Sequence, residues 1–255
     1  MHAAMPRFFV GPDQIVDGRA TLLAADSAHL SRSLRARPGE TIVVVVGGTV
    51  EQGVLLEEVT PERVSGRVIW SRGASGEPRL AVHVLQAVPA QAMDATIEAL
   101  TEVGASSIRP VLTSRTVPRP DVSRASRRLE RWQRIACEAA QLAARAAIPQ
   151  VHGVLPMREA LEALPSDTAL LACVARADAA PILTAIPAAP GHVGLVIGPE
   201  GGLDDVDIAL LDDAGAAWVH LGPRTLPSRL AGAVATALLL AGAGDLDSAA
   251  EPLPL

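Results

Sequence analysis

The stretch VIGPEGGLDD (Val196–Asp205) joins an apolar run to a glycine pair and then to a group of acids. Its first three residues complete VGLVIG (Val193–Gly198), a continuous apolar segment typical of a strand that is buried on both faces of a parallel sheet. The glycines allow the backbone to turn sharply and to approach a ligand closely. The acids suit the positive end of a following helix. The stretch therefore predicts a strand, a turn and a helix, with a ligand site at the carboxyl end of the strand.

A second Gly-Pro turn occurs in HLGPRTLPSRL (His220–Leu230), again between a predicted strand and a predicted helix. Two such strand ends would line one pocket made largely of backbone groups. The alternative for the first stretch is a plain strand-to-helix turn without a ligand. Because the chain contains no GxxxxGK[ST] and no GxGxxG after a predicted strand, a phosphate-binding loop is disfavoured.

The chain up to residue 75 shows short strands and turns. TIVVVVGGTV (Thr41–Val50) is rich in β-branched residues and ends in a Gly-Gly hairpin pattern. A short helix is expected over Ser27–Arg35, before Pro38 and Gly39. We predict a small β-barrel or sandwich, followed by a linker in SRGASGEPR (Ser71–Arg79).

Beyond the linker, predicted strands alternate with predicted helices. This order favours an α/β domain with a mostly parallel sheet covered on both faces. The helices are expected from Met93 to Gly104 and at 123–147, 157–164, 179–185, 204–213 and 226–241. The expected division of the chain is 1–75, 76–246 and a disordered tail, 247–255.

Composition narrows the class of protein. The 255 residues carry a net charge of −6, which argues against a protein that coats nucleic acid non-specifically. Cys137 and Cys173 have no CxxC spacing and no nearby histidine pair, so they are interpreted as reduced thiols, with neither a metal site nor a disulfide. The start of the chain lacks a signal-peptide pattern, and no apolar segment is long enough to cross a membrane. We expect a soluble cytoplasmic protein.

IGPEGGL, an acidic helix, LGPR and an alanine-rich closing helix resemble the bacterial 16S ribosomal RNA uridine N3 methyltransferases, a family of the SPOUT class. PRFFV, HLSRSLRARPGE, EALTEVGASSIRPVLTSRTV and RWQRIACEAAQLAARAAIP resemble the same family in the same order. The resemblance implies an N-terminal barrel similar to PUA domains and an α/β domain whose last part forms a trefoil knot. It also implies a homodimer that binds S-adenosylmethionine in the knot and methylates N3 of a uridine in the small ribosomal subunit.

The same resemblance implies which residues form the sites. The cofactor would contact the two Gly-Pro turns and nearby residues: Cys173, Ile197, Gly198, Pro199, Glu200, Gly201, Gly202, Leu221, Gly222, Pro223, Arg224, Leu226 and Ala231. Arg32, Arg35, Arg115 and Arg145 match family positions that would contact RNA. The predicted RNA contacts also include Arg7 and three arginines of the cluster described next, Arg128, Arg131 and Arg134.

Residues 115–134 form an arginine-rich segment with a local net charge of +5. Such clusters often contact RNA phosphates without reading the sequence. The alternative is an exposed helix face partly paired with Glu130, and for Arg145 a structural ion pair.

Methyl transfer to uridine N3 needs positioning of the two reactants and either a base or stabilisation of the uridine anion. No catalytic residue is assigned; the candidates are Arg229, Arg145 and Glu200, although for Glu200 we favour a structural role in which its carboxylate holds the turn. His83, His192 and His220 are expected to be hydrogen-bonded core residues.

The chain departs from the family pattern after LGPR. Where the family usually has arginine and glutamate, this chain has Pro227 and Arg229. Two alternatives to the main hypothesis follow: a relative that binds RNA and cofactor but has lost turnover, and an active enzyme with another RNA substrate.

Overall fold

The computed structural model describes residues 5–89, 91–115, 124–174, 178–186, 191–247 and 253. The chain forms two compact units, one made of Met1–Glu77, Gln141–Ala147 and Ala250–Leu255, the other of Pro78–Ala140 and Ile148–Ala249. Arg119 of the arginine-rich segment, the predicted start of the long helix at Ser123 and most of the predicted tail lie outside the described residues.

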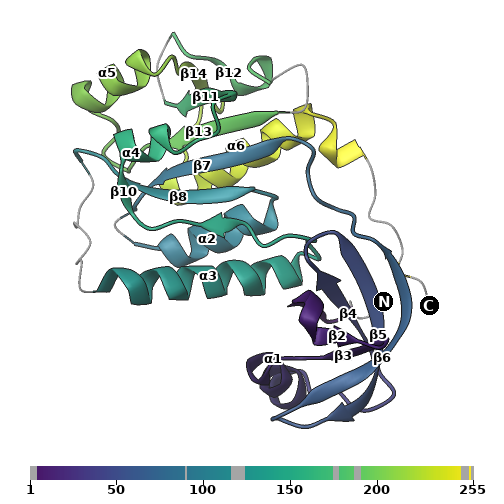
Figure 1. Cartoon of the computed structure of the whole chain (residues 1–255). Helices are drawn as coiled ribbons and strands as arrows, with labels where there is room; N and C mark the ends of the chain where they lie inside the picture. Colours follow the sequence, from purple (N-terminus) through teal and green to yellow (C-terminus); the bar gives the residue numbers. More distant parts are fainter. Residues whose placement is uncertain are drawn as a thin grey trace. The chain divides into compact units, whose positions relative to one another are not determined.

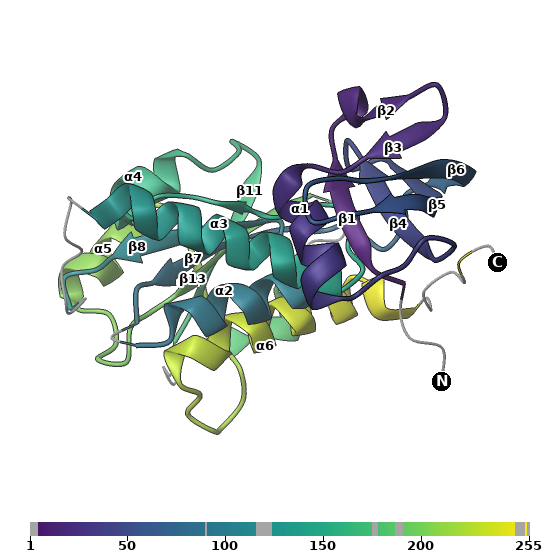
Figure 2. The same cartoon turned by 90° about the horizontal axis from the view of Figure 1, so that it is seen from below.

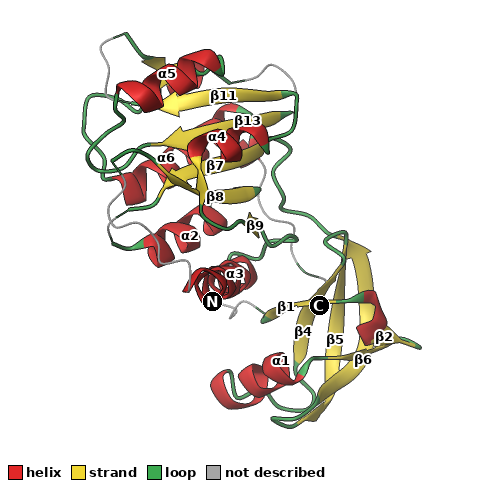
Figure 3. Ribbon diagram, turned by 60° about the vertical axis from the view of Figure 1, so that its left-hand side comes forward, coloured by secondary structure: helices red, strands yellow, loops and turns green. Residues whose placement is uncertain are grey.

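The first unit is a six-stranded sheet with the order β1-β4-β5-β6-β3-β2. Figure 3 shows β1, β4 and β5 side by side in this sheet. β1 pairs with β4 in parallel, and the other pairings are antiparallel. The strands are β1 (Arg7–Val10), β2 (Ile15–Val16), β3 (Arg19–Thr21), β4 (Thr41–Val46), β5 (Val50–Val59) and β6 (Val64–Gly73). A 3₁₀ turn, η1 (Pro12–Gln14), precedes β2.

The predicted hairpin is confirmed, because β4 and β5 are joined through Gly47 and Gly48, whose φ angles are +58° and +72°. The predicted helix begins earlier than expected, as α1 (Ala24–Ala28), and continues into a π-helical turn, η2 (His29–Ser33). Leu30 of η2 is fully buried in the core of this unit beside Phe8 and Ile42.

The second unit contains a parallel sheet in the order β10-β8-β7-β13-β11-β14-β12, with β9 paired to β8. Every pairing described in it is parallel, which confirms the predicted sheet. The strands are β7 (Ala81–Ala87), β8 (Ser107–Leu112), β9 (Gln150–Val151), β10 (Leu155–Pro156), β11 (Thr168–Cys173), β12 (Ala180–Pro181), β13 (His192–Ile197) and β14 (Ala217–His220).

Helices cover both faces of this sheet (Figure 1). They are α2 (Met93–Glu102), α3 (Ala125–Leu142), α4 (Met157–Glu162), α5 (Asp205–Asp213) and α6 (Ser228–Gly242), and the 3₁₀ turns are η4 (Ile182–Thr184) and η5 (Asp245–Asp247).

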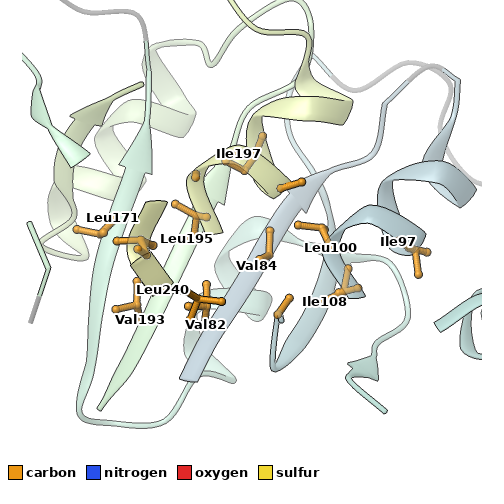
Figure 4. Packing of buried hydrophobic residues seen from close by; sticks show 14 of the residues in the cluster. Val82, Val84, Ile97, Leu100, Ile108, Leu171, Val193, Leu195, Ile197 and Leu240 are labelled. Atoms are coloured by element: carbon orange, nitrogen blue, oxygen red, sulfur yellow. The ribbon is translucent and has the colours of Figure 1, made fainter. Parts of the chain in front are cut away.

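The apolar cluster on one face contains residues of α2, α3 and α6, and the cluster on the other contains residues of α4 and α5. Figure 2 shows α2 beside α6 on the first of these faces, and the two helices are in contact. Val84, Leu195 and Ile197 pack there against Leu100 and Leu240 (Figure 4). The alternation of side chains along each strand thus fills two layers of core.

Three predicted helix boundaries were wrong. The long helix ends at Leu142 rather than at Ala147, because Ala144 is left-handed (φ +55°) and the N–H groups of Ala146 and Ala147 donate to the Glu77 carboxylate. Residues 180–184 form β12 and η4 instead of a helix. The closing helix begins at Ser228 rather than at Leu226, since Pro227 disfavours a helical conformation in the residue before it.

Candidate functional site

The first Gly-Pro turn directly follows β13. Its ends are joined by a hydrogen bond from the N–H of Gly202 to the carbonyl of Pro199, at 2.9 Å. Gly202 has a φ of +72°, a left-handed conformation that glycine adopts without strain. Asp204 then caps α5, because its carboxylate accepts from the N–H groups of Val206 and Asp207 at 3.1 and 3.0 Å. The predicted sequence of strand, turn and acid-capped helix is therefore confirmed.

Two side chains that follow β8 hold this turn and helix. Arg115 donates from Nη1 to the carbonyl oxygen of Gly201 at 2.7 Å. Ser114 donates from Oγ to Oδ2 of Asp207 at 3.0 Å. Arg115 therefore fixes the backbone of the glycine pair in this structure, whereas the sequence suggested only a contact to RNA.

Glu200 does not hold the turn as expected. Its side chain is exposed, and within the described part of the chain its carboxylate accepts no hydrogen bond. The contacts of Gly202 and Arg115 provide that support instead.

The second Gly-Pro turn, between β14 and α6, borders a pocket of about 120 Å³. The N–H of Gly222 donates to Nδ1 of His220 at 3.0 Å, and Gly222 has a φ of +96°. The apolar side chains of Leu221, Leu226 and Ala231 are among the residues that line it. The pocket is lined by Cys173, Val174, His220, Leu221, Gly222, Arg224, Thr225, Leu226 and Ala231.

A buried polar network ties α6 to the end of β13 and to β7. Ser228 donates from Oγ to the carbonyl of Gly198 at 2.7 Å, and Nε2 of Gln86 donates to Ser228 Oγ at 3.0 Å and to the carbonyl of Ala87 at 3.1 Å. Oε1 of Gln86 is buried and has no partner in the described structure. Sequence reasoning missed both residues, although a glutamine at the end of the apolar strand LAVHVLQAV was a usable indication, because buried polar side chains are normally hydrogen-bonded.

The structure brings only part of the predicted cofactor set to the pocket. Cys173, Leu221, Gly222, Arg224, Leu226 and Ala231 line it. The remaining predicted residues lie elsewhere: Ile197 ends β13, Gly198, Pro199, Glu200, Gly201 and Gly202 form the first turn, and Pro223 follows Gly222. Burial raises the pKa of the Cys173 thiol to about 12, so this cysteine is protonated at neutral pH and contributes a neutral wall.

Two predicted RNA contacts are buried in ion pairs of the first unit. Arg7 is 8% exposed and pairs with Glu51 at 2.6 Å. Arg145 is 4% exposed and pairs with Glu77 at 2.6 Å, which corresponds to the structural alternative for this residue. Arg229 and Glu200, the other catalytic candidates, are both exposed.

Arg128, Arg131 and Arg134 of α3 contact neighbouring side chains. Arg131 pairs with Asp94 of α2, and Arg134 lies 3.9 Å from Glu138. The guanidinium of Arg128 lies over the ring of Trp132, 5.8 Å from its centre. Arg32 and Arg35 of the first unit are exposed.

Within the described residues, no group of three or more histidine, cysteine or acidic side chains is arranged to hold a metal ion. Among the same residues, no helix has the length and apolar character needed to cross a membrane. His83, His192 and His220 are hydrogen-bonded, as predicted, but each is partly exposed, so the expectation that they belong to the core was wrong.

Comparison with known proteins defines the class. Residues 76–240 match the family model described as an RNA methyltransferase domain, so the chain belongs to this family of RNA methyltransferases. It is 32% identical over 236 residues to ribosomal RNA small subunit methyltransferase E of Synechocystis, covering 91% of this chain and 76% of the relative. It is 33% identical over 231 residues to the protein of that name from Mycobacterium tuberculosis, covering 88% of this chain and 85% of the relative.

Solved structures agree with this assignment. The ribosomal RNA small subunit methyltransferase E of Neisseria gonorrhoeae, bound to S-adenosyl methionine, superposes with a TM-score of 0.81 at 27% identity, covering 91% of this chain and 95% of that one. A Legionella pneumophila methyltransferase in complex with the same cofactor gives a TM-score of 0.84 at 24% identity, covering 94% and 98% of the two chains, and supports the fold.

Proposed function

We propose that this protein uses S-adenosylmethionine to methylate N3 of a uridine in 16S ribosomal RNA of the small subunit. The observation that carries the proposal is the pocket behind the second Gly-Pro turn, in a chain that belongs to an RNA methyltransferase family. Its apolar wall and backbone edge fit a ligand with a flat ring and polar margins. The cofactor, when bound, supplies an activated methyl group, so the protein mainly positions and orients.

Different residues of the chain would position the cofactor and stabilise the reacting uridine. Leu221, Leu226 and Ala231 would cover the ring, and the backbone of residues 221–226 would offer hydrogen bonds. Arg115 keeps the Gly201 carbonyl in place. Arg229 is exposed at the first turn of α6, where a guanidinium could stabilise the negative charge that develops on a uridine losing its N3 proton.

The knot and the homodimer are part of this proposal. α6 contacts β7 and β13 on one side and η4, from the connection between β11 and β13, on another. This arrangement fits a helix threaded through a loop. Much of the apolar surface of α6 is buried within its own unit. Leu230 of α6 and Leu183 of η4 remain 44% and 55% exposed, and these apolar side chains would suit contact with a second copy of the chain.

For the first unit we propose a PUA-like, RNA-contacting role. Arg32 and Arg35 are the exposed arginines of the original RNA set in this unit, and they would reach phosphates. The buried Arg7 and Arg145 would act by stabilising the unit through Glu51 and Glu77.

The test is methyl transfer from labelled S-adenosylmethionine to 30S subunits that lack uridine N3 methylation, with nucleoside analysis of the product. Cofactor binding is measured by calorimetry on the same preparation. N3-methyluridine supports the proposal. Binding without transfer refutes the substrate and favours one of the two alternatives, and failure of both measurements refutes the pocket.

Pro227 and Arg229 motivate those alternatives, because both side chains are exposed beside the pocket. The double change Pro227→Arg with Arg229→Glu separates them. A gain of activity on ribosomal RNA indicates that this chain had lost turnover, whereas loss of an existing activity indicates adaptation to its own substrate.

A further inference from the structure

A group of histidine, serine and arginine side chains lies at the amino-terminal half of the parallel sheet, away from the two Gly-Pro turns. We call His83, Ser107, Arg109, His152 and His192 the histidine–arginine patch. Strand register places His83 of β7 opposite Ser107 of β8, and Ser107 opposite Gln150 of β9. On the other side of β7, His83 lies opposite Gly194 of β13, and His192 is two residues before Gly194. β13, β7 and β8 are neighbours in the sheet (Figure 1).

These side chains share one face of the sheet. Val82, Val84, Ile108, Val151 and Val193 belong to the apolar cluster on the α2, α3 and α6 face. Because side chains alternate along a strand, the members of the histidine–arginine patch point to the opposite face. The three histidines are partly exposed, so the patch opens to solvent.

Three members form a hydrogen-bonded chain. His83 Nδ1 lies 2.8 Å from Ser107 Oγ, and His83 Nε2 lies 2.9 Å from His192 Nδ1. If Ser107 donates to His83 and His83 donates to His192, Nε2 of His192 carries the N–H at the end of the chain. If His192 donates to His83 and His83 donates to Ser107, the serine hydroxyl is the donor at the other end. In either direction one donor is left for another group.

Arg109 gives the patch its charge and has no carboxylate partner in the part of the chain that is described. It is 8% exposed, and its Nε is buried without a hydrogen bond, as is Nε2 of His152. Burying an unpaired charged group is costly, so buried guanidinium groups are normally paired.

Burial is the main cause of the low pKa values of two of these histidines, and neighbouring basic groups lower them further. Burial, then His192, Arg109 and His152, lower the pKa of His83 to about 4. Burial and Arg109 also lower the pKa of His152. The charged groups acting on these imidazoles are all basic.

From this juxtaposition of an unpaired buried guanidinium with unsatisfied and terminal donors we infer a second binding site, for a phosphate group. Arg109 would provide a fork of N–H donors suited to phosphate oxygens, and His152 and one end of the serine–histidine chain would complete the shell. The phosphate could belong to the RNA backbone or to a small phosphate compound. This site is separate from the proposed methyl-transfer pocket and does not depend on it.

Inorganic phosphate is the first probe, titrated into the full chain at constant ionic strength set with chloride. We expect saturable binding by calorimetry and shifts of the imidazole NMR resonances of His83, His152 and His192. Arg109→Met should weaken binding at least tenfold. Arg63→Met removes the same charge at an exposed position of the first unit and should leave binding unchanged.

The site is refuted if phosphate does not bind saturably, if Arg109→Met binds as well as the wild type, or if the shifted resonances belong to other histidines. Should Arg109→Met fail to fold, the wild-type NMR titration decides by itself. A second titration with an oligouridylate that lacks terminal phosphate identifies the source. Competition with inorganic phosphate indicates the RNA backbone, and lack of competition indicates a small phosphate compound.

Discussion

Replacing Ser228 with alanine would remove the hydroxyl that links α6 to the end of β13. The carbonyl of Gly198 would lose its donor at 2.7 Å, while Gln86 would keep its hydrogen bond to Ala87. Ser228 is 5% exposed, so water does not readily replace the lost bond. One buried polar group left unsatisfied costs about 1–3 kcal/mol. For a chain of this size the melting temperature should fall by roughly 2–4 °C per kcal/mol, or about 4–8 °C for a central cost of about 2 kcal/mol.

The same change should weaken the proposed cofactor site, because Gly198 begins the first Gly-Pro turn. A loss on the order of tenfold in S-adenosylmethionine affinity, about 1.4 kcal/mol, is expected by calorimetry. Ser228→Thr keeps a hydroxyl and should retain most of the affinity. Ser126→Ala, at an exposed position of α3, should shift stability by no more than about 0.5 kcal/mol. If Ser228→Ala melts and binds like Ser126→Ala, the network does not support the site.

Three further changes test neighbouring features. Arg115→Ala should lower cofactor affinity several-fold in calorimetry. Because Arg115 is exposed, the free energy of unfolding should change by less than about 1 kcal/mol. An affinity equal to that of the wild type would show that the hydrogen bond from Arg115 to Gly201 does not position the turn. Gly202→Ala should lower the free energy of unfolding by about 1–2 kcal/mol in thermal unfolding, because Gly202 has a φ of +72°. An added Cβ would meet no atom there, so the cost would come from the backbone conformation alone. Gly201→Ala, at a position without positive φ, is the matched control and should cost less. The pKa of His83 is lowered from 6.5 to about 4 in the folded state, so the unfolded chain takes up this proton at a higher pH than the folded chain does. The free energy of unfolding should therefore fall as the pH drops from 6.5 towards 4. His83→Gln should flatten this dependence, as measured by urea unfolding across that pH range.

Local patterns in the sequence predicted the elements of the second unit well. VGLVIG, the acids after it and the helical spacing from Met93 to Val103 are all short-range features, and each element formed close to its expected bounds. Errors arose where one residue overrides a pattern, as Pro227 does before α6 and as left-handed Ala144 does after α3.

Side-chain partners were beyond reach because they are distant in the sequence. Arg7 and Arg145 were predicted to contact RNA, yet the carboxylates that they pair with lie 44 and 68 residues away in the sequence. No local sequence pattern indicates an ion pair over such a distance. Gln86 and Ser228 are separated by 142 residues. The backbone of the candidate site was thus predictable, whereas the polar contacts that support it required the fold.

Residues 141–147 give the first compact unit an unusual dependence on the order in which the chain is made. Arg7 donates to the carbonyl of Arg145, and Glu77 accepts from Arg145, Ala146 and Ala147. Because residues 145–147 follow α3 in the sequence, these contacts can form only after α2, β8 and α3 have been synthesised. A fragment cut at Glu77 would carry the whole six-stranded sheet and the Arg7–Glu51 pair but lack the Arg145 carbonyl that accepts from Arg7 and the donors to Glu77, so we expect the unit to be less stable as one continuous piece.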